Sequence, residues 1–507
     1  MKKSVSETAK KITTEAIKKT SFSLKVKENN EILSMAAGTA LVSGLSEVKL
    51  NELLHFKNDA IAMVHNLNEE SIGVVFLKNS QNLKAGDKAT RTHQVLSIPV
   101  GNALLGRIIN PLGEPLDKKG KVLTKEFSEI EHPAPEIMMR APVDTPLQTG
   151  IKAIDCFTPI GRGQRELILG DRQTGKTAIA LDTILNQKET GVICIYCAIG
   201  QRQSNTARVI HTLEEHDMLT QSVVVIASGD EEAGMQYIAP YSATAIGEYF
   251  MHQGKDVLVV YDDLTAHAQT YRQMSLLLKT PPGREAFPGD IFYLHSRLLE
   301  RATHLRPKFG GGSLTALPIV LTEAGNISAY IPTNVISITD GQIYLSNDLY
   351  QKGIMPAIDT GRSVSRVGGE AQLPAYRSLI GPLKLFYAQF EELESFSKFG
   401  MQMDKTTLMK LKRGQAIRSA LTQRQYFPVD AITQIGLFMA LNEGLLDQMD
   451  EKQILKAQEV IHQLMMGKFS DISHHILKRE KITDEQKRKM LDVFQKEFIK
   501  KGLPFEK

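Results

Sequence analysis

Residues 170–178 read GDRQTGKTA and constrain the fold of this chain more than any other segment. The pattern Gly170-x-x-x-x-Gly175-Lys176-Thr177 matches a phosphate-binding loop. In such a loop backbone amides face the phosphates, the lysine reaches the β- and γ-phosphates, and the hydroxyl group binds Mg²⁺. The loop stands between an apolar run, RELILG, and a helical pattern, TAIALDTILNQ, as the motif requires. The sequence therefore predicts a nucleotide-binding domain.

Beyond this loop the chain alternates strand and helix patterns. VICIYCAIG, SVVVIAS and DVLVVYDD predict strands, and helices are expected near 205–216 and 241–253. This alternation is typical of a largely parallel sheet covered by helices. We assign residues 96–372, which begin with the Pro- and Gly-rich connector GRIINPLGEPLD, to a central α/β P-loop NTPase domain.

The chain is long enough to need further domains, because 507 residues exceed what one hydrophobic core usually organises. Residues 24–95 alternate short apolar runs with Gly, Asn and Asp turns, which is the pattern of a small N-terminal β-barrel or β-sandwich. Over residues 373–507, helical periods such as AITQIGLFMALNEGLLDQM replace the strand signals and predict a C-terminal α-helical bundle. Residues 1–23 form a lysine-bearing tail.

The composition is that of an ordinary soluble protein, with 42% hydrophobic and 23% charged residues. A formal net charge of +4 gives no indication of nucleic-acid binding. No stretch approaches the roughly 18 consecutive apolar residues of a membrane span. The N-terminus lacks the apolar core of an export signal, so a cytoplasmic location is expected.

The cysteines are expected to be buried core thiols. Cys194 and Cys197 form a Cys-x-x-Cys pair, but both fall on a predicted strand, where residues three apart face opposite sides. Cys156, the third cysteine, has no such partner.

A carboxylate partner for the phosphate loop is expected where the run VLVVYDDL ends, at Asp262 and Asp263. In P-loop NTPases an acid at such a place helps to hold Mg²⁺. We assign this role to Asp262, acting through a water molecule. The predicted metal site therefore consists of Thr177 and Asp262, and the predicted cofactors are ATP or ADP with Mg²⁺.

Several longer stretches resemble one known family: GRGQRELILGDRQTGKTA, LLKTPPGREAFPGDIFYLHSRLLERA, IPTNVISITDGQIYLS and PAIDTGRSVSRVGGEAQ. They closely resemble the α subunit of the F-type rotary ATP synthase, in its bacterial form. The resemblance runs from about residue 24 to the C-terminus. The run DRQTGKT separates this subunit from the catalytic β subunit, whose loop is richer in small residues. The resemblance implies the same domain order as above.

Gln201 bears on whether the site hydrolyses its nucleotide. In the β subunit the matching position is a glutamate that polarises the attacking water, whereas this chain reads CAIGQRQSN. An amide has no basic carboxylate to orient or deprotonate water. The resemblance therefore implies that this site binds Mg-ATP and turns it over negligibly, so the isolated chain is expected to be nearly inactive.

The resemblance assigns catalytic roles at a neighbouring subunit to Arg366 and Ser363, in the run SVSRVG. Arg366 is expected to be an arginine finger that stabilises charge on the γ-phosphoryl group of a nucleotide held by a β subunit. Ser363 matches another position associated with activity. Phosphate-loop residues and matched adenine contacts make up the predicted nucleotide site: Gly170, Asp171, Arg172, Gln173, Thr174, Gly175, Lys176, Thr177, Gln201, Tyr350, Gln423 and Gln425.

Three features depart from the family pattern. Met355 stands where an arginine is usual in the run Gly-Ile-Arg-Pro, so a cation near the nucleotide is missing. Arg362 replaces an aliphatic residue before the SVSR run, and the loop over 305–314 is shorter than usual.

The resemblance also implies the assembly. Catalytic β subunits are expected to alternate with this chain in a hexameric ring around a central γ shaft. The tail over 1–23 is compatible with a helix that binds the peripheral-stalk δ subunit and equally with a solvated segment. The membrane-embedded sector would be reached indirectly, so we expect a peripheral protein on the cytoplasmic face of the bacterial inner membrane. The implied reaction is ATP synthesis or hydrolysis coupled to proton or sodium transport.

Two other classes of function share the phosphate loop. A hexameric RNA-translocating ATPase of the transcription-terminator type has a GRGQR-like run but needs an aromatic RNA platform. Residues 1–95 contain only Phe22, Phe56 and Phe76 as aromatic residues, so no nucleic-acid partner is expected. A self-sufficient protein-export ATPase would need the acid that Gln201 replaces.

Overall fold

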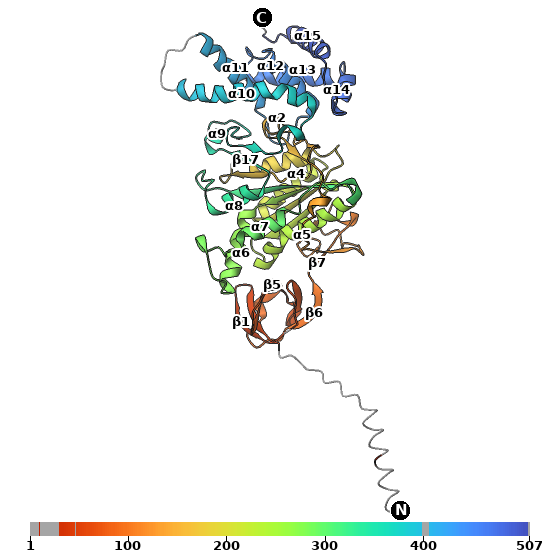
Figure 1. Ribbon diagram of the computed structural model, residues 1–507, viewed down its shortest axis with the longest axis vertical. Helices are drawn as coiled ribbons and strands as arrows, with labels where there is room; N and C mark the ends of the chain where they lie inside the picture. The colour runs from red at the N-terminus through yellow and green to blue at the C-terminus, as the bar shows by residue number, and fades with distance from the viewer. Residues whose placement is uncertain (1–9, 11–29, 46, 398–404, 505–507) are drawn as a thin grey trace, which may run out of the picture.

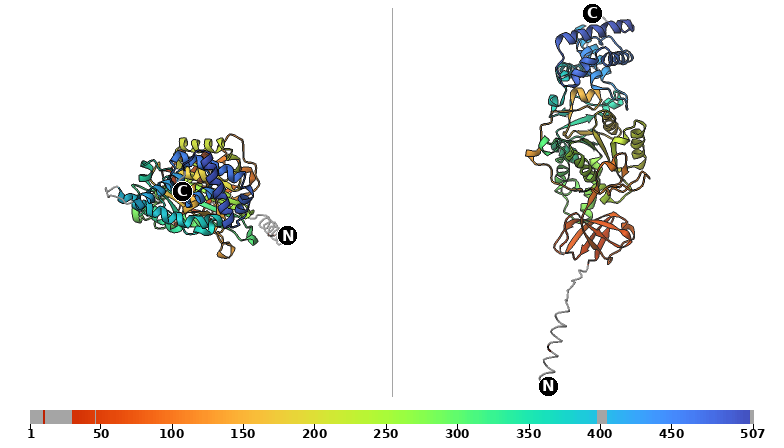
Figure 2. Two further views of the ribbon diagram at one scale, coloured as in Figure 1. Left: turned by 90° about the horizontal axis from the view of Figure 1, so that it is seen from above. Right: turned by 90° about the vertical axis from the view of Figure 1, so that its right-hand side faces the viewer.

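The computed structural model describes residue 10 and residues 30–45, 47–397 and 405–504. Figure 1 shows a barrel at one end, an α/β domain in the middle and a helical domain at the other end. The right-hand view in Figure 2 shows the same stacking along one long axis, and the left-hand view looks down that axis. The predicted tail over 1–23 lies outside the described residues, apart from Lys10.

The N-terminal domain is an antiparallel barrel of six strands in the order β1-β2-β5-β4-β3-β6. These strands are β1 (Ile32–Ala36), β2 (Thr39–Ser43), β3 (Glu52–His55), β4 (Ile61–Leu67), β5 (Ser71–Lys78) and β6 (Thr90–Val95). The barrel closes next to its two edge strands, where Glu31 pairs with Lys88 and the Ala89 amide donates to the Asn30 carbonyl oxygen at 2.8 Å. Closure removes the free sheet edges that would otherwise seek other strands.

Strand β5 fixes how the barrel sits on the central domain. Its side chains alternate between two faces. Val74 and Phe76 pack inside the barrel, whereas Val75 and Leu77 join the core of the central domain. One strand therefore belongs to two hydrophobic cores, which holds the two domains together.

The central domain is built on an eight-stranded sheet in the order β18-β17-β12-β16-β15-β13-β14-β8. Its strands are β8 (Ile108–Ile109), β12 (Leu167–Gly170), β13 (Ile193–Gln201), β14 (Ser222–Ser228), β15 (Asp256–Asp262), β16 (Ser313–Leu321), β17 (Gly341–Leu345) and β18 (Val364–Ser365). Every neighbouring pair is parallel except β17 with β18, which is antiparallel. The predicted largely parallel sheet is confirmed.

Helices cover both faces of this sheet: α3 (Lys176–Leu185), α4 (Gln203–Glu215), α5 (Ala233–His252), α6 (Leu264–Leu277), α7 (Ile291–Leu299) and α8 (Tyr330–Ile338). Cys194 belongs to the hydrophobic cluster on one side and Cys197 to the cluster on the other. Both cysteines, and Cys156, are buried free thiols, as predicted.

One helix boundary was missed. Helix α5 begins at Ala233, eight residues before the start expected at 241. Nearly all of its residues are buried, so polar and apolar positions do not alternate with a helical period. Pro240, which lies within the helix, is also a residue type that usually signals a helix boundary in a sequence.

Smaller elements complete the central region. They are β7 (Ser97–Pro99) paired with β9 (Phe127–Glu129), β10 (Pro146–Leu147) paired with β11 (Ile160–Gly161), and the short helices α2 (Lys152–Phe157) and α9 (Asn347–Gln351). Helix α2 joins the central domain to the helical one. Its Asp155 carboxylate accepts a hydrogen bond from the Gln434 amide at 2.9 Å, and Lys152 Nζ donates to Gln458 Oε1 at 2.9 Å.

The C-terminal domain is a helical bundle, as predicted. Its helices are α10 (Pro374–Ser397), α11 (Lys405–Leu421), α12 (Ala431–Asn442), α13 (Glu451–Met466), α14 (Ser470–Leu477) and α15 (Asp484–Lys500). Helix α12 is the centre of the bundle, since every residue from Ile432 to Leu441 is buried. Within the part of the chain that the structure describes, no helix has both the length and the apolar character to cross a membrane.

Candidate nucleotide-binding site

The phosphate loop links a buried strand to the start of a helix. Strand β12 ends at Gly170 and helix α3 begins at Lys176, so the loop amides lie at a helix N-terminus, where anions bind favourably. A Cβ atom at Gly170 would lie 2.7 Å from the Leu345 carbonyl oxygen, and Gly175 has φ +101°. Both positions therefore require glycine. The buried Lys176 ammonium donates to the Asp171 carbonyl oxygen.

Asp171 holds the loop in place. Its Oδ1 accepts hydrogen bonds from Thr322 Oγ1 at 2.6 Å and from the Gly325 amide at 2.9 Å. Thr174 Oγ1 donates to the Asp171 carbonyl oxygen at 2.8 Å. The loop is thus fixed to the segment that follows β16.

Asp262 lies beside the loop hydroxyl group. Its Oδ2 accepts from Thr177 Oγ1 at 2.7 Å and from the Tyr196 hydroxyl at 2.7 Å. Asp263 instead caps helix α6, where its Oδ1 accepts from the Ala266 amide at 2.7 Å. The pair is therefore divided: Asp262 faces the phosphate loop, and Asp263 serves the helix.

Burial sets the protonation of this cluster. It raises the pKa of Asp262, and burial together with the Asp262 charge raises the pKa of Asp263 to about 7. Burial lowers the pKa of Lys176 to about 8, although the neighbouring carboxylates oppose this. A bound cation and phosphates would supply the charges that keep all three groups ionised.

Gln201 sits at the end of β13 between the two aspartates. Its Nε2 donates to Asp262 Oδ1 and to Asp263 Oδ2, both at 3.2 Å. A carboxylate here would bring three acids together, whereas the amide supplies the hydrogens that bind the other two. The position expected for a water-activating acid is thus occupied by a hydrogen-bond donor.

These groups open into a cavity of about 1490 Å³. The cavity brings together loop residues, the two aspartates and segments of the helical domain. The predicted site residues that line it are Asp171, Arg172, Gln173, Thr174, Gly175, Lys176, Thr177, Gln201, Asp262, Tyr350, Gln423 and Gln425. Met355, where a cation is usual in the family, also lines it.

The two glutamines at the far end of the cavity differ. Gln423 is 9% exposed, and its amide is fully used: Oε1 accepts from the Lys152 amide at 3.0 Å, and Nε2 donates to the Gly150 and Phe427 carbonyl oxygens at 2.8 and 2.9 Å. Gln425 is exposed, and its side chain makes no hydrogen bond with any described residue. Gln425 is therefore the one that is free to contact a nucleotide base.

Some lining residues were not predicted. Asp182 on α3 lines the cavity, and its Oδ1 accepts from the Tyr426 amide at 2.7 Å. Burial raises the pKa of Asp182 to about 6. Arg202, Asn205 and Arg208 also line the cavity, and their three-residue spacing places them on one face around α4. This spacing, directly after Gln201, is the sequence signal from which these three lining residues could have been predicted.

Ser363 and Arg366 do not line this cavity. Ser363 is buried, with its Oγ donating to the Asp359 carbonyl oxygen at 2.6 Å and accepting from the Tyr344 amide at 3.0 Å. Arg366 is exposed, and its backbone amide donates to the Asp340 carbonyl oxygen at 2.8 Å. The Arg366 guanidinium has no hydrogen bond or ion pair within the described residues.

Arg362, the second departure from the family pattern, packs on its own chain. Its guanidinium lies 5.2 Å from the centre of the Tyr344 ring and 3.6 Å from the Asp359 carboxylate. The short loop over 305–314 contains a 3₁₀ turn (Pro307–Phe309) and three glycines, and it leads into β16.

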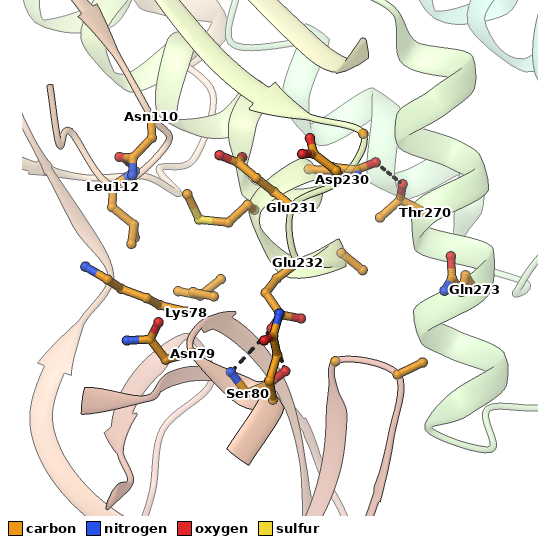
Figure 3. A pocket seen from close by; sticks show the side chains of 18 of the residues that line it. Lys78, Asn79, Ser80, Asn110, Leu112, Asp230, Glu231, Glu232, Thr270 and Gln273 are labelled. Carbon is orange, nitrogen blue, oxygen red and sulfur yellow. Dashed lines mark hydrogen bonds between the residues drawn. The ribbon is translucent and has the colours of Figure 1, made fainter. Parts of the chain in front are cut away.

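A second cavity of about 920 Å³ lies between the barrel and the central domain. Figure 3 shows Glu232 directed at Ser80, which donates a hydrogen bond to it. Lys78 pairs with Glu114 at 2.8 Å. The acidic side chains that line this cavity form hydrogen bonds or ion pairs with other residues of this chain.

The fold and the first cavity define a P-loop nucleotide-binding protein with a β-barrel on one side and a helical bundle on the other. Three family models match it: ATP synthase alpha/beta family, beta-barrel domain over residues 29–93; ATP synthase alpha/beta family, nucleotide-binding domain over 150–365; and ATP synthase alpha/beta chain, C terminal domain over 372–497. The chain belongs to this family, as one of its F-type ATP synthase α subunits.

Individual relatives agree. The chain is 53% identical over 470 residues to ATP synthase subunit alpha 2 of Syntrophus aciditrophicus, covering 93% of this chain and 91% of that one. It is 55% identical over 464 residues to ATP synthase subunit alpha 1 of Shewanella frigidimarina, covering 92% and 90%. It is 52% identical over 487 residues to ATP synthase subunit alpha 1 of Chlorobium luteolum, covering 96% and 95%.

Proposed function

We propose that this subunit holds Mg-ATP in its own cavity with negligible turnover, and that it donates Arg366 to a catalytic site on a neighbouring β subunit. The chain acts in ATP synthesis or hydrolysis coupled to proton or sodium transport. Two observations carry the proposal. Gln201, at the position expected for a water-activating acid, donates to both aspartates, and the Arg366 guanidinium is exposed and unpaired within the described residues.

The residues present fit a magnesium nucleotide. Thr177 and Asp262 offer a hydroxyl and a carboxylate oxygen 2.7 Å apart, and Mg²⁺ prefers such oxygen ligands. Asp262 would hold the ion through water. When bound, the ion neutralises charge on the β- and γ-phosphates. Lys176 and the loop amides bind the phosphates, and Gln425 and Tyr350 contact the base.

Gln201 prevents turnover in this site because its Nε2 donates to two carboxylates and because an amide group is not basic enough to take a proton from water. Asp171 is tied to Thr322 and Gly325, and Asp182 to the Tyr426 amide, so neither is free to replace the missing base. Glu323, also on the cavity wall, is exposed and remains solvated.

Arg366 acts by positioning and charge. A planar guanidinium can donate two parallel hydrogen bonds to phosphoryl oxygens, which stabilises the charge that develops in the transition state. Its exposed position allows it to act on a nucleotide that another chain binds.

The proposed partners are β subunits that alternate with this chain in a hexameric ring, a γ shaft, and a δ subunit of the peripheral stalk. The proposed location is the cytoplasmic face of the bacterial inner membrane, with the membrane sector contacted indirectly. No nucleic acid is involved.

The test reconstitutes wild-type and Arg366→Ala chains with β and γ subunits. We expect multisite ATP hydrolysis to fall by a factor on the order of 10³ to 10⁵, as for other missing arginine fingers. Nucleotide binding to this chain's own site, and assembly, should stay near wild type. If the Arg366→Ala complex retains most of its hydrolytic activity, the proposed role of Arg366 as an arginine finger is wrong.

The isolated chain provides the second arm of the test. Purified free of β subunit, it should bind Mg-ATP in a calorimetric titration and show almost no steady-state ATPase activity. Robust turnover that is abolished by Glu323→Gln would assign the missing base to Glu323 and contradict the non-catalytic role.

A further inference from the structure

Glu166 is a buried carboxyl group that does not line the nucleotide cavity. It directly precedes β12 and is 0% exposed. Its Oε2 accepts from Gln164 Nε2 at 2.7 Å, whereas its Oε1 is buried and has no hydrogen-bond partner. A buried acid with one unsatisfied oxygen is unfavourable, so its position calls for an explanation.

The carboxyl group lies against the strand pair that carries Arg366. Gly341 of β17 pairs with Ser365 of β18, the residue directly before Arg366. A Cβ atom at Gly341 would lie 2.5 Å from Glu166 Oε2 and 2.3 Å from the Val364 carbonyl oxygen. Only glycine fits there, so the absent side chain brings the carboxyl group into contact with the strand pair.

A hydrogen-bond chain extends this contact to the residue beside Arg366. Gln164 Nε2 donates to both Glu166 Oε2 and Ser365 Oγ, the latter at 3.2 Å. Ser365 Oγ in turn donates to the Pro159 carbonyl oxygen at 2.7 Å and accepts from the Gly368 amide at 3.1 Å. The backbone on both sides of Arg366 is therefore anchored through Gln164 and Glu166.

Charge links the two residues as well. Burial raises the pKa of Glu166 well above its usual value, the Gln164 hydrogen bond and the Arg366 guanidinium lower it, and the Asp340 carboxylate raises it further. Asp340 is itself paired with Arg165, which also pairs with Glu300. Within the described residues the Arg366 guanidinium has no ion-pair partner, so it is a nearby cation that can respond to the charge of the Glu166 carboxyl group.

We propose that Glu166 is a positioning residue for Arg366. When Glu166 is protonated and neutral, the Arg366 guanidinium is free to point away from this subunit. When Glu166 is ionised, its carboxylate attracts the guanidinium back towards the β17–β18 strand pair. The Glu166 carboxyl group loses its proton to solvent as the Arg366 guanidinium moves back towards it, because a buried carboxylate needs a counter-charge. The inference rests on the proposed role of Arg366 as a finger.

The test uses the reconstituted complex and its pH profile of ATP hydrolysis. In the wild type, kcat should fall on the alkaline side as the Glu166 carboxylate competes for Arg366. Glu166→Gln cannot ionise but keeps an oxygen that accepts from Gln164, so it should retain wild-type kcat at low pH and lose the alkaline fall. Glu166→Leu frees Gln164 and should lower kcat about tenfold with KM unchanged, as expected for one unsatisfied buried group.

Two controls separate positioning from stability. Asp155→Asn neutralises another buried carboxyl group, one that binds Gln434 in the helical domain, and it should leave the alkaline limb unchanged. In an Arg366→Ala background, Glu166→Gln should have no further effect on the pH profile of hydrolysis, because Glu166 acts through Arg366.

The outcomes distinguish the two proposals. If Arg366→Ala lowers hydrolysis by a factor on the order of 10³ or more while Glu166→Gln and wild type have the same pH profile, the role of Glu166 is refuted and the proposed role of Arg366 stands. If Arg366→Ala retains hydrolysis, both fail. An effect of Glu166→Gln that persists at equal size without Arg366 also refutes the link between them.

Discussion

The nucleotide cavity and the Arg366 segment belong to the same sheet, yet one is complete within this chain and the other is not. In the cavity, Lys176, Thr177 and Asp262 are each held by partners in the same subunit. At the sheet edge, the backbone around Arg366 is anchored, but its guanidinium is exposed and unpaired within the described residues.

Under the proposed function, this difference divides nucleotide binding and catalysis between two subunits. A site whose polar groups are satisfied internally is preorganised to bind. A guanidinium on a fixed backbone without a partner is preorganised to act on something else. Changes to the two regions should therefore affect different measurements.

The largest effect is expected from Arg366→Lys. The ammonium keeps the charge but loses the planar, two-pronged geometry, so hydrolysis by the reconstituted complex should fall about 10³-fold, at the lower end for a missing finger. Steady-state hydrolysis checks this. The comparison breaks if the lysine variant is nearly as active as wild type, because charge alone would then suffice.

Lys176→Ala should affect the other region. Removing a charged hydrogen-bond donor to phosphate should weaken ATP binding to the isolated chain by roughly 10- to 100-fold. Calorimetry of the isolated chain measures this. Lys188→Ala, at an exposed lysine paired with Asp217, is the matched control and should bind normally. Equal loss in both variants would mean that the ammonium at 176 has no special role.

The two aspartates should separate by about tenfold in Mg²⁺-dependent nucleotide affinity, the value of one charge-assisted interaction. Asp262→Asn removes the carboxylate that faces Thr177 and should show the loss. Asp263→Asn keeps an oxygen that caps α6, since asparagine is a good N-cap residue, and should bind nearly as wild type. Titrations with and without Mg²⁺ check the order, and a reversed order would exchange the two roles.

The two glutamines should affect different measurements, and the effect of Gln425→Ala on binding is the smallest that we expect. Gln423→Ala leaves the Lys152 amide and the Phe427 carbonyl oxygen without a partner among the described residues and removes one of the two donors to the Gly150 carbonyl oxygen. It should lower the free energy of unfolding by roughly 1–3 kcal/mol. Gln425→Ala should leave thermal unfolding unchanged and weaken ATP binding several-fold, about 0.5–1.5 kcal/mol. If Gln425→Ala destabilises the fold and leaves binding intact, the assignment within this pair is wrong.

Much of the fold could be predicted because its signals are local. The barrel, the largely parallel sheet and the helical bundle were each indicated by periodicity over a few residues. Helix α5 shows the limit: its start at Ala233 has no amphipathic pattern to mark it, because both sides of the helix are buried. Burial by distant segments removed the signal on which the prediction depended.

The candidate site was predictable where one short segment supplies it. The loop from Gly170 to Thr177 carries its glycines, lysine and hydroxyl in consecutive positions. Gln423 and Gln425 were indistinguishable in the run LTQRQYFP, and only the neighbouring Gly150 and Lys152 separate them. Contacts between segments some 270 residues apart leave no trace in either segment alone.

The sequence by itself determined that this chain has a phosphate loop, a strand ending in two aspartates, and a glutamine, Gln201, at the position where the family resemblance leads us to expect a water-activating acid. Tertiary structure alone decided that Gln201 binds both aspartates, that Asp262 rather than Asp263 faces Thr177, and that Glu166 lies against the strands that carry Arg366. The physical reason is that residue type and spacing fix the local backbone, whereas hydrogen-bond partners and buried charges depend on which distant segments pack together.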